Sequence, residues 1–250
     1  MKIIQGQGVS KGIEQGTIYF YHRAAAQVEM RTGADEQEER ARLERAKERT
    51  AQQLSDMAEK AREEAGDEAA VLFETHAMFL EDEDYTGAMD ELLAQGFNAE
   101  YAVDQAGQEF AAMLASMDDP YMQARAADIK DVTGRILNNL MGVVEGGIDS
   151  DVPVILCADD LAPSETIQLD KKKILAIATQ KGSGNSHTAI LARTMGIPAV
   201  CGLGEDFNED FHGKQAYIVG ETGQLILEPD EETLLSLKVR HAKQEETREL

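Results

Sequence analysis

The sequence has few basic residues, few cysteines and no long apolar run, and each shortage excludes a class of protein. Its 24 lysines and arginines stand against 47 aspartates and glutamates, which gives a net charge of −23. Such a charge opposes binding to nucleic acid, whose phosphates need basic side chains, and favours a basic protein partner. Because no apolar run approaches the roughly 18 residues of a membrane span and the N-terminus carries no signal peptide, we expect a cytoplasmic protein that does not enter a membrane.

The two cysteines, Cys157 and Cys201, lie in short apolar runs and lack the spacing of a metal site. This pattern predicts buried, unpaired thiols in a reducing compartment and not a disulfide framework. We therefore expect this chain to hold no metal ion.

Proline is scarce in the middle of the chain, where Pro120 is the only one between Asp35 and Met141. Ala, Glu, Gln, Leu and Met, all strong helix formers, are abundant in this region. Asp119 before Pro120 is typical of a helix start, and Gly142 of a helix end. We predict an all-α bundle of antiparallel helices, one through 43–61 and others over 67–80, 85–95, 99–117 and 120–141.

Short strands are predicted on both sides of this helical region. Residues 1–22 are broken by glycines, and 17–21 are rich in β-branched and aromatic side chains. Strands that alternate with helical or turn segments indicate an α/β layer domain, and further apolar strands are predicted at 152–157, 174–178, 198–201, 216–219 and 224–227. We predict an α/β domain made of residues 1–24 and 145–230, a helical subdomain inserted over 25–144, and a polar linker helix over 231–250.

One histidine is placed where a phosphoryl group could be held. His187 ends a turn of Gly, Ser and Asn residues, at the point where an apolar helix begins. A helix N-terminus stabilises anions through its N–H groups and dipole, and it disfavours a cationic ring, which leaves a lone pair for attack. We predict that His187 is a phospho-accepting nucleophile; the alternative is an ordinary structural histidine. The predicted phosphate-cradling turn consists of Gly182, Ser183, Gly184, Asn185, Ser186, Thr188 and Arg193.

The segment around His187 resembles the phosphohistidine signature of the phosphoenolpyruvate-utilising enzymes, except that Ser183 stands where Gly or Ala is usual. Ser183 could either tighten the turn or donate a hydrogen bond to the phosphate. In order and spacing, the whole chain is similar to the N-terminal half of enzyme I of the bacterial sugar phosphotransferase system. The other stretches that carry this resemblance are 8–13, 72–83, 125–132 and 160–166.

The resemblance implies a fold and a reaction. The fold is an α/β phosphohistidine domain with an inserted helical subdomain that binds the small carrier protein HPr. Phosphoenolpyruvate and Mg²⁺ bind to a C-terminal barrel domain absent from these 250 residues, and His187 takes the phosphoryl group at Nε2 and passes it to HPr. Thr166 hydrogen-bonds Nδ1 of the ring, although without the resemblance it could equally be a turn threonine. We expect a monomer with no cofactor of its own that is inactive with phosphoenolpyruvate alone.

Acidic side chains beside Met78 and Phe79 predict a docking surface. An adaptable apolar centre with an acidic rim suits a basic partner. The alternatives are a solvated helix end for residues 81–84 and a core position for Met78. With the resemblance, the partner is HPr and the docking residues are Glu68, Glu74, His76, Met78, Phe79, Asp82, Glu83, Tyr121 and Arg125.

One departure from the family concerns charge. Many members carry a lysine near the start of the second helix, whereas residues 66–70 contain none. Cationic help to phosphoryl transfer must then come from Arg193 or from HPr.

Two other functions stay open at this point. A swivelling domain of pyruvate phosphate dikinase or phosphoenolpyruvate synthase shares the histidine signature, but we would not expect the inserted bundle there. A non-catalytic acidic adaptor would account for the bundle and the charge of −23, but not for the turn before His187.

Overall fold

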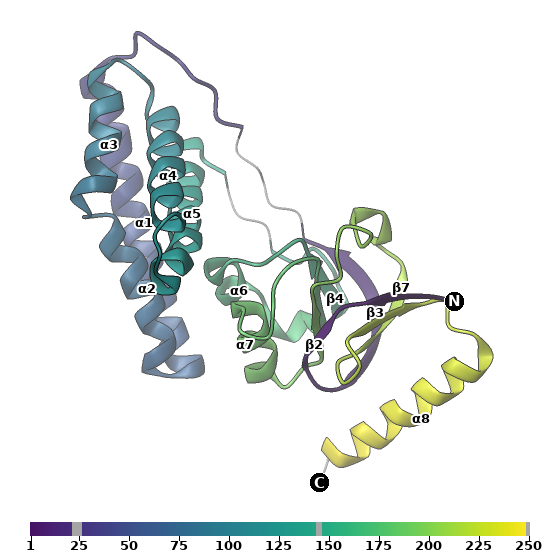
Figure 1. The fold of residues 1–250 in the computed structure, drawn as a ribbon. Helices are drawn as coiled ribbons and strands as arrows, with labels where there is room; N and C mark the ends of the chain where they lie inside the picture. The colour runs from purple at the N-terminus through teal and green to yellow at the C-terminus, as the bar shows by residue number, and fades with distance from the viewer. Residues whose placement is uncertain (22–26, 144–146, 249–250) are drawn as a thin grey trace. The chain divides into compact units, whose positions relative to one another are not determined.

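The computed structural model describes residues 1–21, 27–143 and 147–248. The chain forms two compact units (Figure 1), one of residues 1–22 and 146–250 and the other of residues 23–145. The boundaries predicted at 24/25 and 144/145 lie outside the described residues. The architecture is an α/β part with an inserted helical bundle, as predicted.

The helical unit is a bundle (Figure 1), and local sequence signals set the ends of its last helix. Asp119 caps the last helix by accepting from the Tyr121 N–H at 2.8 Å, with Pro120 at its first position. Gly142 ends that helix in the left-handed conformation, with φ 67°. The helices are α1 (Glu36–Ala65), α2 (Asp67–Phe79), α3 (Glu83–Ala94), α4 (Ala99–Ala115) and α5 (Pro120–Met141).

Close packing and one ion pair join the helices of this unit. Gly107 of α4 faces Thr133 of α5, where a Cβ would lie 2.4 Å from the threonine Oγ1. The same hydroxyl is 2.6 Å from the buried Tyr85 Oη of α3. Arg42 of α1 pairs with the buried Glu100 of α4. Gly107 thus lets α4 approach α5 at the position where Thr133 meets Tyr85.

The α/β unit is built on an eight-stranded sheet of order β1-β8-β7-β3-β4-β5-β6-β2, in which β3 to β6 are parallel and the remaining pairs antiparallel. The strands are β1 (Lys2–Gln5), β2 (Gln7–Ser10), β3 (Ile13–Phe20), β4 (Val154–Ala158), β5 (Ile174–Thr179), β6 (Ala199–Cys201), β7 (Gln215–Val219) and β8 (Gln224–Leu227). Only Gly6 separates β1 from β2, which stand at opposite ends of this order, so the sheet curls until its edges meet. Gly8 permits the close approach, because a Cβ there would lie 1.9 Å from the Gly220 carbonyl oxygen.

Both faces of the sheet are covered. In β4, Val154 and Leu156 pack on the side of α6 (Pro163–Gln168) and α7 (His187–Met195), and Ile155 packs with Phe207 and Phe211 on the other side. This alternation is the two-residue period of a strand buried on both faces. Figure 1 shows α6 and α7 together on one side of the sheet.

The C-terminal helix α8 (Glu231–Arg248) packs on the antiparallel half of the sheet. Its Leu237 is buried with Ile13 and Tyr217, and the Gln244 Oε1 accepts from the Ile13 N–H at 2.7 Å. One apolar side thus packs α8 within the first unit, and the role of a linker predicted for residues 231–250 stays a prediction. No helix in the described part of the chain has the length and apolar character to span a membrane.

Candidate functional site

His187 is the first residue of α7 and follows a tight turn at the carboxyl end of β5. Ser186 caps this helix, because its Oγ accepts from the Ala189 N–H at 3.3 Å. The Ser186 N–H in turn donates to the Ser183 carbonyl at 3.0 Å, which closes the turn. Gly182 has φ 96°, a left-handed conformation that favours glycine. The imidazole is exposed at a helix N-terminus, where an anion is stabilised.

Arg193 ties this turn to α7 and β2. Its Nη2 donates to the Gly184 carbonyl at 2.9 Å, and its Nη1 donates to the Val9 carbonyl at 3.3 Å. The side chains of Ser183 and Asn185 are exposed. The Arg193 guanidinium is therefore fixed beside the turn, and the Ser183 side chain lies in solvent.

The turn packs over Cys201 of β6. A Cβ on Gly182 would lie 3.7 Å from the Cys201 Cβ. Cys201 and Cys157 are both buried and unpaired, as predicted. Burial raises the pKa of the Cys201 thiol, so this group stays protonated near neutral pH.

Thr166 lies in α6, which packs against α7. Its side chain is buried, and its Oγ1 donates to the Pro163 carbonyl at 2.8 Å. Because the hydroxyl proton is used there, Oγ1 can meet an imidazole only as an acceptor from a ring N–H. This chemistry matches the role predicted for Thr166, which stays a prediction.

Thr188, one residue of the predicted phosphate cradle, is 1% exposed, since the second position of α7 faces the sheet. Its hydroxyl is buried as well. The Thr188 side chain therefore does not reach the surface on which His187 lies, and its part in the cradle stays a prediction.

The predicted docking residues of α2 and α5 meet in a cluster of aromatic rings around one arginine. The Arg125 guanidinium lies 4.7 Å from the Tyr121 ring centroid and 5.8 Å from that of Phe79. Tyr121 is 60% exposed and Met78 is 72% exposed. Exposed apolar side chains in a group are typical of an interaction surface.

Acidic residues of the predicted rim have different tasks. Glu74 pairs with Arg62 of α1 at 2.6 Å. The Asp82 carboxylate caps α3 by accepting from two backbone N–H groups at 3.0 Å. Glu68 and Glu83 are exposed. The acidic rim that these residues would form stays a prediction, and Asp82 also serves the fold.

His76 was predicted as a docking residue, and this prediction is wrong. Its side chain has no exposed surface. The ring Nε2 lies 3.2 Å from the Asp128 Oδ1, and Nδ1 lies 3.9 Å from the Asp131 Oδ2. The physical reason is helical spacing, because His76 follows the buried Phe73 by three positions on the inner side of α2. Across the described residues, no group of three His, Cys, Asp or Glu side chains is arranged to hold a metal ion.

Val71 is an exposed residue of α2 that was not among the predicted docking residues. It is 54% exposed and precedes Met78 by two helical turns, so the two side chains share one side of α2. The seven-residue spacing was the signal that could have found it. We call the surface made of Glu68, Val71, Glu74, Met78, Phe79, Tyr121 and Arg125 the α2–α5 face.

Comparison with known proteins places both units in one family. Residues 5–125 match the family described as PEP-utilising enzyme, N-terminal, and residues 151–223 match PEP-utilising enzyme, mobile domain. A phosphoenolpyruvate-protein phosphotransferase of Priestia megaterium is 37% identical over 243 residues, which are 96% of this chain and 42% of that protein. A phosphoenolpyruvate-protein phosphotransferase of Lactococcus lactis subsp. lactis (strain IL1403) is 38% identical over 233 residues, which are 92% of this chain and 40% of that protein. The chain therefore spans about two fifths of the length of these relatives.

Two solved structures resemble the chain almost from end to end. The N-terminal domain of Enzyme 1 - Nitrogen, 24% identical with a TM-score of 0.62, covers 95% of this chain and 98% of its own, and it shows the fold alone. A solution NMR structure of Enzyme I is 32% identical, with a TM-score of 0.77 over 97% of this chain and 99% of its own. The chain thus belongs to the Enzyme I family of PEP-utilising enzymes and corresponds to its N-terminal and mobile domains.

Proposed function

We propose that this chain carries a phosphoryl group on His187 and exchanges it with HPr in sugar phosphotransfer. The observation that supports this most directly is the position of His187, exposed at the start of α7 behind a glycine turn capped by Ser186. The family supports the reaction class, since the relatives are named phosphoenolpyruvate-protein phosphotransferase.

In the transfer step, the lone pair of His187 Nε2 attacks the phosphorus of the donor. One P–N bond forms at His187 Nε2 while the P–N bond of the donor phosphohistidine breaks; the donor ring, protonated on its other nitrogen, leaves as a neutral imidazole, and His187 keeps its Nδ1–H. Thr166 accepts from Nδ1–H, which fixes the tautomer that leaves Nε2 unprotonated. The N–H groups at the start of α7 and the guanidinium of Arg193 stabilise the phosphoryl oxygens.

HPr docks on the α2–α5 face in this proposal. Met78, Val71 and the rings around Arg125 provide an apolar centre, and Glu68 provides an acidic edge. A carrier with a basic rim around a small apolar patch complements this surface in charge and in character.

Phosphoenolpyruvate and Mg²⁺ are assigned in this proposal to a separate C-terminal domain, outside these 250 residues. We therefore expect no labelling of this chain by phosphoenolpyruvate and Mg²⁺ alone. Addition of a phosphorylated HPr is expected to label it.

The test is transfer from ³²P-labelled phospho-HPr to the wild-type chain, to His187→Ala and to His241→Ala. His241 lies in α8, where its Nε2 is 3.2 Å from Glu14, so this control removes a histidine away from the turn. We expect acid-labile, base-stable label on the wild type and on His241→Ala, and none on His187→Ala. Label on His187→Ala would refute the assignment of the nucleophile. HPr binding without any transfer would leave the adaptor alternative.

A further inference from the structure

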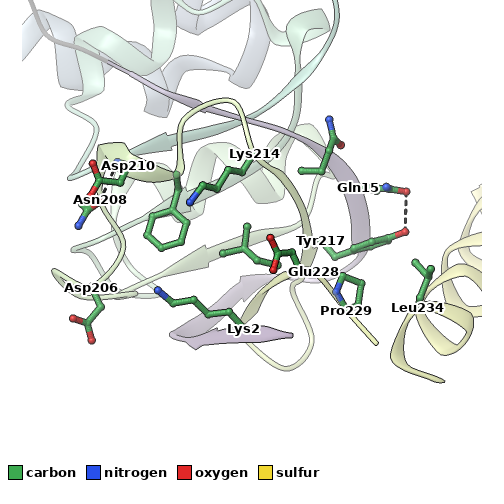
Figure 2. Close-up of a pocket in the computed structure, with 13 residues that line it drawn as sticks. Lys2, Gln15, Asp206, Asn208, Asp210, Lys214, Tyr217, Glu228, Pro229 and Leu234 are labelled. Carbon is green, nitrogen blue, oxygen red and sulfur yellow. Dashed lines mark hydrogen bonds between the residues drawn. The ribbon is translucent and has the colours of Figure 1, made fainter. Parts of the chain in front are cut away.

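A cavity of about 720 Å³ opens beside the antiparallel half of the sheet, and the phosphoryl chemistry described above does not use it (Figure 2). It is lined by the ends of β1, β7 and β8, by the segment after β6 and by the start of α8. Apolar walls come from Phe211, Leu227 and Leu234. Tyr217 lines it too, and its hydroxyl donates to the Gln15 Oε1 at 2.8 Å.

The strand register explains why two lysines meet in this cavity. Lys2 of β1 pairs with Leu227 of β8, and Leu227 pairs on its other side with Ala216 of β7. Lys214 stands just before β7. The neighbouring strands β1, β8 and β7 therefore bring Lys2 and Lys214, which lie far apart in the sequence, to the same end of the sheet. Figure 2 shows Lys2 and Lys214 entering the cavity from opposite sides.

Both ammonium groups lie against one aromatic ring. Lys2 Nζ is 4.6 Å from the Phe211 ring centroid, and Lys214 Nζ is 5.0 Å from it. Neither forms an ion pair with a carboxylate of the described residues, although the chain carries 47 acidic side chains. Two cations that share a ring and form no ion pair make a place where one anionic group is attracted to both.

Glu228 adds a second, independent observation. It has φ 48° and is the only residue other than glycine with a positive φ in the described part of the chain. A non-glycine residue costs energy in this conformation, and such residues concentrate at ligand sites. Glu228 lines the cavity together with Pro229, which follows it (Figure 2).

The acidic residues of the cavity limit the size of the anion. Asp206 and Asp210 lie on one side, with Asn208, and Glu228 is the third carboxylate of the lining (Figure 2). Their charge, together with the net charge of −23, repels a polyanion such as nucleic acid. A small molecule with a single anionic group is attracted by the two lysines, and it carries less charge for the carboxylates to repel than a polyanion does. Its apolar body can contact Phe211 and Leu227.

We propose that this cavity binds a small organic molecule with one phosphate, phosphonate or carboxylate group, held between Lys2 and Lys214, and an apolar body against Phe211 and Leu227. The site is separate from the turn of His187, and the proposal does not depend on phosphoryl transfer.

The test is a titration of the ¹⁵N-labelled chain with phenylphosphonate, followed through ¹H–¹⁵N spectra. This probe has a dianion and a ring, and its C–P bond keeps it from donating a phosphoryl group. We expect saturable shifts centred on the amides of Asn208, Lys214 and Gln215. Benzyl alcohol, which has the ring without the anion, should give no saturable shift at these amides.

Two charge-matched variants decide whether the lysines form the site. Lys2→Gln combined with Lys214→Gln should raise Kd for phenylphosphonate at least tenfold, or about 1.4 kcal/mol. Lys11→Gln combined with Lys172→Gln removes the same charge from exposed positions outside the cavity lining and should leave Kd within about twofold. If the first pair unfolds the chain, Lys214→Gln alone serves, with an expected rise of about threefold. The absence of saturable shifts, or equal weakening in both variant pairs, would overturn the proposal.

Discussion

The two units place their motif histidines in opposite surroundings. His187 is exposed at the start of α7, behind a turn defined by Gly182 and Ser186. His76 is buried inside α2 between Asp128 and Asp131. The residue types of a turn indicate its backbone conformation, whereas the surroundings of a residue inside a helix depend on how that helix packs. The same residue type in two recognisable motifs can therefore serve chemistry in one and packing in the other.

The largest expected effect separates the two histidines by function. His187→Gln should lose all label from phospho-HPr, because an amide nitrogen offers no lone pair for attack. His76→Gln should reach the wild-type extent of labelling at equilibrium, since the buried ring does not contact the phosphoryl group. Gel-separated ³²P counts measure both, with circular dichroism to verify folding. A folded His76→Gln chain without label would break the comparison.

Substitution of the same two histidines should change the free energy of unfolding in the opposite order, with the larger loss at His76. His76→Ala leaves a cavity and two facing carboxylates without the ring, and we expect a loss of about 3 kcal/mol in the free energy of unfolding. His187→Ala changes an exposed side chain and should stay within about 0.5 kcal/mol. Urea unfolding followed at 222 nm measures both values. Equal losses would mean that the burial of His76 contributes nothing.

How far the sequence predicts each unit follows from the same contrast. The helix that starts at Asp119-Pro120 and ends at Gly142, and the turn before His187, were predictable because caps and glycines act locally. The burial of His76 and Thr188 was not, because helical spacing alone does not say which side meets the core. Strands β1 and β2 were predicted only as a β-like, glycine-broken segment, since each has four residues and their edge positions depend on long-range pairing. The two lysines on Phe211 could not be predicted either, because strand register brings them together.

A buried ion pair gives the helical unit a pH dependence that can be measured. Desolvation acts to raise the pKa of the Glu100 carboxyl, but hydrogen bonds from Arg42, the backbone and Asn98 outweigh it, and the pKa is lowered. A carboxyl with a lowered folded-state pKa contributes stability above its unfolded pKa and loses it as the pH falls through the folded pKa. Glu100→Gln should cost about 2 kcal/mol at pH 7, and this difference from the wild type should shrink in acid. A difference that stays constant down to pH 3 would contradict the role of the ion pair.

The docking role of the α2–α5 face predicts a smaller effect on affinity. Met78→Ala removes a side chain that is 72% exposed, and we expect about tenfold weaker HPr binding, or about 1.4 kcal/mol. Met141→Ala is the matched control, since Met141 is exposed at the end of α5 opposite to Tyr121. Isothermal titration calorimetry with HPr measures both constants. Equal weakening in the two variants would remove the α2–α5 face from the proposal.

The smallest effect compares one substitution, Gly→Ala, in the two units. Gly182 has φ 96°, and alanine there is strained although its Cβ would meet atoms only at 3.5 Å and beyond. We expect Gly182→Ala to cost about 1 kcal/mol and to slow phosphoryl acceptance, since the strain distorts the turn before His187. Gly87 lies inside α3 with nothing within 4 Å of an added Cβ, so Gly87→Ala should stabilise the chain by about 0.5 kcal/mol through helix propensity. A lower Tm for Gly182→Ala and a higher Tm for Gly87→Ala would show that backbone conformation defines the turn of the α/β unit, whereas a Gly182→Ala chain as stable as the wild type would mean that the turn tolerates ordinary residues.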